Sequence, residues 1–249
     1  MNHSTKTPSA IVLCAMLALA TTAAEAAPKY KTDMPPSAEL AYTIKARQKG
    51  IPLEGEGVMR WSLDGRRFNA TNEARAVLIG KILDARSEGD VDAFGLAPAS
   101  YTEKRFRKEA ATTAFDRAAG AIRFTNAEQT YPIKGGEQDR NSVIWELVAV
   151  ARAAKAKVKP GASWDFVVAG VRDAEPWTFR VVKQEKIGTP VGELNTLHIT
   201  RVRPAESTDQ HIDIWLAPSI EWYPARIRYS EDDGDYIEQT LRGISGKTP

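Results

Sequence analysis

Apolar and polar residues alternate along most of the chain. Leu40, Tyr42 and Ile44 are separated by less apolar residues, which is typical of a strand with one buried face. A second strand passes through Val58 and Trp61, and Asp64-Gly65 then predicts a tight hairpin turn. A third strand follows through Phe68 and its neighbours, and later strands are predicted at residues 84–91, 101–108, 112–115, 121–124, 164–169, 176–184, 194–202, 211–216, 225–230 and 236–241.

One segment breaks this alternation. Between Val143 and Ala151 nearly every residue is apolar, and Glu146 is the exception. A helix that is apolar on all sides is a buried helix, so we expect a helix at about residues 139–155 that is surrounded by other elements. Asp139 is placed to accept hydrogen bonds from the first free amides of this helix and is predicted as its N-cap.

Two further stretches interrupt the alternating strand pattern. Residues 77–83 (VLIGKIL) are interpreted as an irregular apolar link between two strands, with a short helix or a bent strand as alternatives. Leu96-Ala97-Pro98 is predicted to be a corner, because proline cannot donate to a sheet ladder.

Many short strands with turn residues between them indicate a mainly β fold. A large twisted sheet tends to curl. We therefore predict a single antiparallel curved sheet or open barrel, with the helix either buried in its concave face or covering its mouth. The single β-rich domain is predicted at residues 38–243, after a flexible Pro- and Lys-rich leader at 27–37 and before a tail at 244–249.

The first residues predict export. Lys6 precedes an apolar run at residues 10–20, and Ala24-Glu25-Ala26 fits a signal peptidase site, so residues 1–26 are predicted to be a cleaved signal peptide. The mature protein is then periplasmic, with secretion as the alternative. It contains no cysteine and no apolar run long enough to span a bilayer, and its formal charge of +2 argues against a nucleic-acid partner.

Few residues indicate catalysis or metal binding. His211 and Asp213 share one face of a predicted strand, which is half a metal site without a visible third ligand, and His198 would need a carboxylate brought to it by the fold. The carboxylates of residues 231–235 (EDDGD) lack the ligand spacing of a calcium loop and are interpreted as a solvated turn. Hydrolase-elbow and phosphate-loop motifs are absent from the sequence. We predict no catalytic residue, no metal and no cofactor.

Six residues are candidates for a ligand-binding or structural anchor. Asp139 and Arg140 open the buried helix, and the structural role of a cap with an ion pair is favoured over an anchor in a ligand cleft. The aromatic candidates Trp215 and Trp222 could line a pocket. Arg226 and Arg228 share one strand face, either solvated or holding an anionic head group at the rim.

The chain from about residue 38 to residue 241 resembles bacterial domain-of-unknown-function family 3108, which occurs in envelope proteins. The resemblance rests on seven stretches: GIPL at 50–53, EARA at 73–76, RSEG at 86–89, QDRNS at 138–142, TPVGELNTL at 189–197, WLAP at 215–218 and YPARIRY at 223–229. It implies a periplasmic β-rich domain with no assigned chemistry. In outline this domain looks like the open β-barrels of the lipoprotein-sorting carriers, an analogy of fold alone.

These observations favour a non-enzymatic periplasmic domain that binds an apolar or amphipathic ligand or an envelope partner, such as a lipid or a lipoprotein. The alternative is a structural scaffold for envelope integrity with a packed interior. A hydrolase is the least favoured hypothesis. A cavity of several hundred cubic ångströms would favour the ligand binder over the scaffold.

Overall fold

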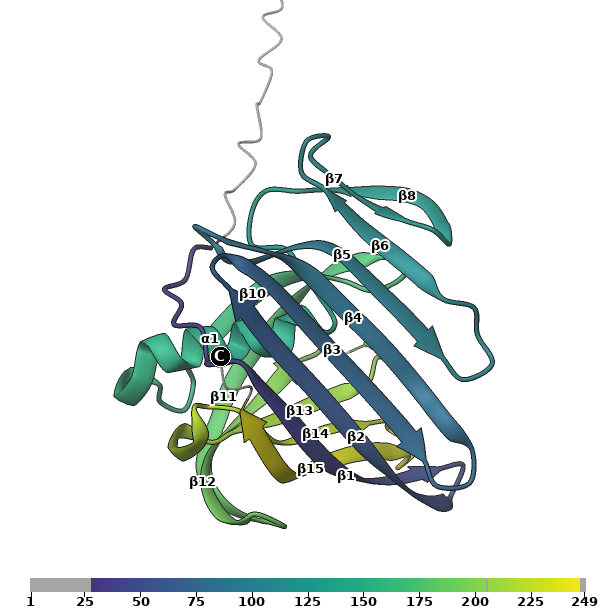
Figure 1. The fold of residues 1–249 in the computed structure, drawn as a ribbon, viewed down its shortest axis with the longest axis vertical. Coiled ribbons are helices and arrows are strands. Elements are labelled where there is room, and N and C mark those ends of the chain that lie inside the picture. The colour runs from purple at the N-terminus through teal and green to yellow at the C-terminus, as the bar shows by residue number, and fades with distance from the viewer. Residues whose placement is uncertain (1–27, 205, 247–249) are drawn as a thin grey trace, which may run out of the picture.

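A computed structural model describes residues 28–204 and 206–246. These residues form one fifteen-stranded sheet and one α-helix (Figure 1). The first half of the sheet contains β1 (Ala38–Gln48), β2 (Ile51–Asp64), β3 (Arg67–Ala76), β4 (Gly80–Asp92), β5 (Gly95–Arg105), β6 (Ala111–Asp116), β7 (Ala121–Phe124) and β8 (Ala127–Pro132). The second half contains β9 (Gln138–Asp139), β10 (Ser163–Ala169), β11 (Ala174–Thr189), β12 (Gly192–Val202), β13 (His211–Leu216), β14 (Pro224–Ser230) and β15 (Tyr236–Gly246). Helix α1 (Ser142–Ala154) and two short 3₁₀ turns, η1 (Lys155–Lys157) and η2 (Pro218–Ile220), complete the fold.

The sheet is built almost entirely from sequential antiparallel hairpins. Its order is β8-β7-β6-β5-β4-β3-β2-β1-β15-β14-β13-β12-β11-β10-β9, so β1 pairs with β15 and joins the two halves at the centre. Among the described residues, only β9 and β10 pair in parallel, through Gln138 and Asp139. The sheet curls into an open barrel, as the alternating pattern predicted (Figure 1).

Helix α1 lies inside the concave face of this sheet (Figure 1). Ten consecutive residues, Ser142–Ala151, are buried, which explains the nearly unbroken apolar run. The ring of Trp145 stacks on Trp61 of β2 with centroids 5.1 Å apart and meets Tyr223 edge-on. The helix begins three residues later than predicted, because residues 138 and 139 pair with β10 as a short strand.

The turns account for most differences from the predicted strands. The predicted hairpin after Asp64 is present, and Gly65 takes the positive φ of 56° that this tight turn requires. The predicted corner at residues 96–98 is wrong, because β5 runs through it. Pro98 is instead accommodated by a β-bulge opposite Gly89, where a side chain on Gly89 would collide with the β5 backbone.

Other boundaries shift as well. Residues 77–79 form an exposed turn between β3 and β4, and Gly80 already begins β4, so the irregular link is shorter than predicted. Strands β8 and β9 were not predicted, since one is a mostly exposed edge strand and the other has only two residues. Strand β15 extends to Gly246, three residues into the predicted tail.

The segment before β1 differs from the predicted flexible leader. Its backbone carbonyls accept hydrogen bonds from core side chains: Trp61 Nε1 donates to Pro35 O at 3.0 Å and Tyr223 Oη to Pro36 O at 2.8 Å. Extended proline-rich backbone has free carbonyls to offer, and this explains the packing. The predicted signal peptide, residues 1–26, lies outside the described residues. No helix in the described part of the chain is long and apolar enough to cross a membrane.

Candidate functional site

A cavity of about 500 Å³ lies at the N-terminal end of α1, between β3–β5 and the second half of the sheet. A smaller cavity of about 100 Å³ adjoins it along β1 and β2. The two cavities are neighbours, since Ile82, Gln210, Tyr229, Glu231 and Ile237 line both.

The cavity wall is apolar in part and polar in part. Its apolar residues come from strands on both sides and from the helix, and include Ala74, Leu83, Ala85, Ile144, Ile212 and Ile237. Its polar residues include Asn72, Glu103, Arg140, Asn141, Arg201 and Gln239. Such a mixed wall suits a ligand that has an apolar body and a polar end.

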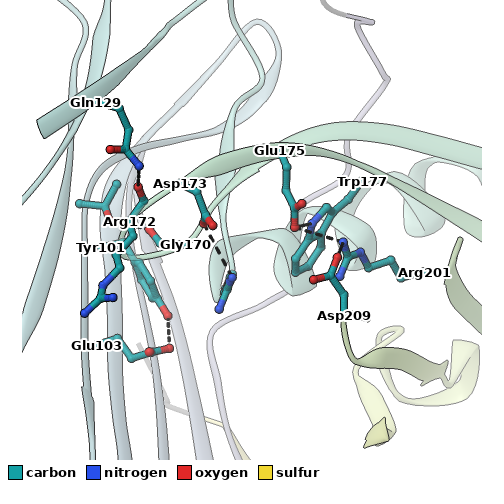
Figure 2. A network of polar contacts seen from close by, with 12 residues as sticks. Tyr101, Glu103, Gln129, Gly170, Arg172, Asp173, Glu175, Trp177, Arg201 and Asp209 are labelled. Atoms are coloured by element: carbon teal, nitrogen blue, oxygen red, sulfur yellow. Dashed lines mark hydrogen bonds and ion pairs between the residues drawn. The ribbon is translucent and has the colours of Figure 1, made fainter. Parts of the chain in front are cut away.

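Arg201 of β12 is the most tightly held basic residue of the wall. Its Nη2 atom donates to Glu175 Oε1 at 3.1 Å and to Asp209 Oδ2 at 2.9 Å, as Figure 2 shows. The guanidinium also lies 4.1 Å from the centre of the Trp177 ring. Because its side chain is only 5% exposed, these contacts keep Arg201 in one position at the wall.

A second polar group lies on β5. Tyr101 Oη donates to Glu103 Oε2 at 2.7 Å (Figure 2), and Arg105 Nε donates to Glu103 Oε1 at 2.7 Å. Burial, together with the adjacent Glu103 carboxylate, holds the pKa of Tyr101 well above its usual range. Tyr101 is therefore a neutral hydrogen-bond donor at physiological pH.

Arg140 is placed in the wall by the pairing of β9 with β10. Its backbone amide donates to Ala169 O at 3.2 Å, and its Nη2 atom lies 3.9 Å from Asp173 Oδ1. The guanidinium passes so close to Gly170 that a Cβ there would be 2.9 Å from Nη2. The absence of a side chain at residue 170 thus makes room for Arg140.

Asp139 is fully buried beside the cavity. Its Oδ1 atom accepts from the backbone amides of Asn141 and Ser142, both at 2.8 Å, and from Ser87 Oγ at 2.6 Å. These are the amide contacts predicted for a helix cap, although the helix itself begins at Ser142. Burial raises the pKa of Asp139 to about 6, and the hydrogen bonds from Ser87 and the two amides limit that rise.

Five buried polar atoms of the cavity wall have no hydrogen-bond partner within the described protein. They are Asn72 Oδ1, Arg140 Nε, Asn141 Oδ1, Arg201 Nε and Gln239 Oε1. Buried polar groups normally have a partner, because an unmade hydrogen bond costs roughly 1–3 kcal/mol. Each of these five atoms is inaccessible to solvent, so they mark the polar character of the wall rather than contact points for a molecule in the cavity.

The other candidate anchors lie elsewhere. Trp222 lines a separate hollow of about 450 Å³ near Lys155 and Pro218, whereas Trp215 packs with Ile187 and Ala225 in a small apolar cluster. Arg226 and Arg228 lie on the same strand face, as predicted, and both approach Glu238. Of the six predicted anchors, only Arg140 lines the main cavity.

His198 and His211 each meet a carboxylate, but neither lines a cavity found in the described residues. His198 Nε2 lies 2.8 Å from Asp213 Oδ1, and its ring stacks on Trp215 with centroids 4.4 Å apart. The pKa of Asp213 is lowered overall. Burial by itself would raise this pKa, but the hydrogen bonds from His198 and Thr200 outweigh burial. His211 Nε2 lies 2.9 Å from Asp232 Oδ1 in the exposed acidic turn. Across residues 28–204 and 206–246, no three His, Cys, Asp or Glu side chains gather closely enough to hold a metal.

The sequence analysis missed most of the polar wall. Asn72 continues the inward series of Phe68 and Ala70, and Gln239 lies between the inward positions Ile237 and Leu241. Arg201 likewise follows Ile199 on the inward face of β12. A polar residue that falls in phase with the buried face of a strand is the signal that could have identified them.

The fold and the cavity define a class of protein: a β-barrel-like domain, an open curved antiparallel sheet around one buried helix, with a cavity beside the helix. Within that class the chain belongs to the family described as "Protein of unknown function (DUF3108)", which matches residues 41–242. This confirms the family resemblance of the seven sequence stretches. No curated protein matches the chain.

Solved structures share the architecture at low sequence identity. A β-barrel-like protein of the domain of unknown function DUF1849 from Brucella abortus is 13% identical, with a TM-score of 0.58 over 87% of this chain and 100% of that one. A putative outer membrane lipoprotein-sorting protein domain from Vibrio parahaemolyticus is 7% identical, with a TM-score of 0.32 over 86% of each chain. A putative exported protein with a YmcC-like fold from Bacteroides fragilis is 9% identical, with a TM-score of 0.33 over 88% of this chain and all of that one. The Brucella structure supports the barrel-like fold and nothing further.

Proposed function

We propose that this protein is a non-enzymatic binder of an amphipathic ligand. The observation that carries the proposal is the cavity of about 500 Å³ whose wall combines apolar strand residues with polar side chains that include Asn72, Arg140 and Gln239. The apolar body of the ligand contacts Leu83, Ile144 and Ile212. Its polar end lies against the polar side chains of the wall, among them Asn72, Arg140 and Gln239. The predicted export places this binding in the periplasm.

Arg140 is the residue best suited to select an anionic end group. Its guanidinium has one distant carboxylate neighbour, Asp173, whereas Arg201 is already paired with Glu175 and Asp209. An arginine with spare donors binds a carboxylate or a phosphate strongly. A ligand with an anionic head and an apolar tail therefore fits the wall best.

The first experiment is native mass spectrometry of the protein purified from the periplasm under gentle conditions. A copurifying small molecule of defined mass is expected, and the same spectrum shows whether the chain begins at Ala27. A protein without any bound species could still bind an added probe, so dodecanoate is then titrated by calorimetry.

Substitutions locate the site. Arg140→Gln should weaken dodecanoate binding roughly tenfold or more, because a charged hydrogen bond is lost. Ala85→Phe should weaken it by filling the cavity. Arg228→Gln is the matched control, since Arg228 has nearly the same side-chain exposure as Arg140 (37% against 38%) but pairs with Glu238 outside the main cavity.

Three results together would contradict the proposal. If native protein carries nothing, dodecanoate does not bind, and Ala85→Phe raises the melting temperature, the cavity is a packing defect. The structural scaffold for the envelope would then be the better description of this chain.

A further inference from the structure

Exposed apolar side chains gather at the ends of three neighbouring hairpins. Of the nine large apolar side chains that the described residues expose, five lie here: Ile51, Val77, Leu78, Ile79 and Phe106. Leu78 is 93% exposed, Val77 73% and Ile51 61%. Turn positions usually carry Gly, Asn, Asp or Ser, so three consecutive aliphatic residues at the tip of the β3–β4 turn have no local explanation.

The three turns lie side by side at one end of the sheet (Figure 1). Val77 N donates to Glu54 O at 3.0 Å, which ties the β3–β4 turn to β2 just after Ile51. Phe106 N donates to Ile82 O at 3.0 Å, which ties the β5–β6 turn to β4. Neighbouring strands are about 4.8 Å apart, so the five apolar side chains lie within roughly 20 Å along the sheet.

Basic residues surround these apolar tips. Segments 47–54, 75–81 and 104–109 together contain eight Lys and Arg residues and two acidic ones. Lys49, Arg107 and Lys108 are all exposed. The loops at the same end of the other half of the sheet are acidic instead, with four carboxylates in residues 231–235 and two more at Glu206 and Asp209. The acidic turn adjoins the first tip, because Lys49 N donates to Asp235 Oδ2 at 2.6 Å.

An exposed apolar patch marks an interaction surface, and the charge around it indicates the partner. Aliphatic and aromatic residues flanked by Lys and Arg are the composition of surfaces that enter the interface of an anionic bilayer. The side chains at the tips would reach the acyl boundary while the basic residues meet the phosphates. A protein partner would need an apolar surface with an acidic rim. A second copy that packed tip against tip would bring the same positive charge.

We propose that the hairpin tips at 49–51, 77–79 and 106–108 dock this protein onto an anionic phospholipid surface. The docking residues adjoin the main cavity. Arg105, which precedes Phe106, and Ile82, which accepts a hydrogen bond from Phe106 N, both line that cavity. This inference goes beyond the proposed ligand binding and does not rest on it, because it is carried by exposed residues that do not line the cavity.

Vesicle flotation tests the proposal with the full-length mature chain. Binding is expected to vesicles of phosphatidylglycerol and phosphatidylcholine (3:7), to weaken as NaCl rises from about 50 to 500 mM, and to be at least several-fold weaker on pure phosphatidylcholine. Leu78→Glu should reduce binding roughly tenfold, because the leucine side chain is no longer buried on docking and the added carboxylate is repelled by the anionic surface. Val191→Glu is the matched control, an exposed apolar residue in the β11–β12 turn at the other end of the sheet.

A second variant reports insertion without relying on loss of binding. Leu78→Trp should keep the fold, given the exposure of Leu78, and its added emission should shift to the blue only with phosphatidylglycerol present. Wild-type binding that Leu78→Glu leaves unchanged would overturn the proposal, as would no binding to either vesicle. It would also be overturned if light scattering showed a dimer that Leu78→Glu dissociates in the absence of vesicle binding.

Discussion

At the scale of single residues, Glu146 is the most unusual feature of the core. It is fully buried in the apolar helix α1, where its Oε2 atom accepts from Leu96 N at 2.7 Å. The carboxyl occupies the space beside Gly95, whose φ of +109° and missing side chain both permit this approach, because a Cβ there would overlap the carboxyl. Burial raises the pKa of Glu146 to about 8, and the hydrogen bond from Leu96 opposes that rise. Glu146 is therefore mostly protonated at neutral pH.

This pKa predicts how stability depends on pH. A raised folded-state pKa means that the folded chain binds the proton more tightly than the unfolded chain. The contribution of Glu146 to stability is present in full below about pH 4.5 and is lost as the pH rises through about 8. Glu146→Gln, which stays neutral and keeps an oxygen for Leu96 N, should melt several degrees above wild type at pH 9 and close to it at pH 5.

Thermal melts from pH 5 to pH 9 provide the measurement. Glu109→Gln is the control, because Glu109 is exposed between β5 and β6. Parallel wild-type and Glu146→Gln curves across this range would show that the buried carboxyl does not titrate in the folded protein.

At the scale of elements, α1 fills the barrel interior with apolar side chains. Its residues Val143, Ile144, Trp145, Leu147, Val148, Val150 and Ala151 all belong to the cluster that also includes strand residues from both halves of the sheet. The helix thus packs against both halves of the sheet, which are joined by strand pairing at β1 and β15 in the centre of the sheet. Without it, the concave face would be exposed to water.

Leu147 tests this role, since its side chain is fully buried. Leu147→Asp should lower the free energy of unfolding by about 4 kcal/mol or more, because an unpaired carboxylate would lie in an apolar environment. Leu147→Met, which conserves volume, should cost less than about 1.5 kcal/mol. Urea unfolding measures both, with Lys157→Asp in the exposed turn η1 as the control. A Leu147→Asp protein as stable as wild type would contradict the burial of α1.

At the scale of the whole molecule, the open sheet is closed by side chains rather than by strand pairing. Thr113 Oγ1 on β6 donates to Gly170 O at 2.7 Å, and Gln129 Nε2 on β8 donates to Arg172 O at 2.8 Å (Figure 2). Gln138 Nε2 also donates to Leu96 O at 2.7 Å. These three hydrogen bonds cross from the first half of the sheet to the segments beside its other edge and explain the barrel-like shape.

Such a closure predicts uneven protection of the backbone amides. Strand β1 pairs on both sides, whereas β8 is mostly exposed and lies at a free edge. Hydrogen exchange followed by mass spectrometry should label residues 127–132 well before 38–48, because edge strands open locally at lower free energy. Thr113→Val should speed exchange at 111–116 and 170–173 and leave 38–48 unchanged. Equal protection of β1 and β8 would mean that the closure is stronger than these side-chain hydrogen bonds imply.

The local pattern of the sequence was enough to predict the mainly β fold, the buried helix and most of the strands. Alternation with a period of two follows from strand geometry, and a helix apolar on all sides has to be covered, whatever covers it. The turn at Gly65 could also be predicted from local sequence, since its backbone conformation depends on that residue and its neighbours. The corner expected at Pro98 failed because the accommodating bulge depends on Gly89 in another strand.

The cavity was decided by tertiary structure alone. Asn72, Glu103, Arg201 and Gln239 come from four strands, and only the curl of the sheet brings their side chains to one wall beside Arg140. Conversely, residue type alone suggested a ligand site at Trp215, Arg226 and Arg228. These residues belong to the part of the sheet outside that wall. A single strand's pattern shows which residues point inward, but the depth of the concave face and the space left by α1 depend on contacts between residues far apart in the chain.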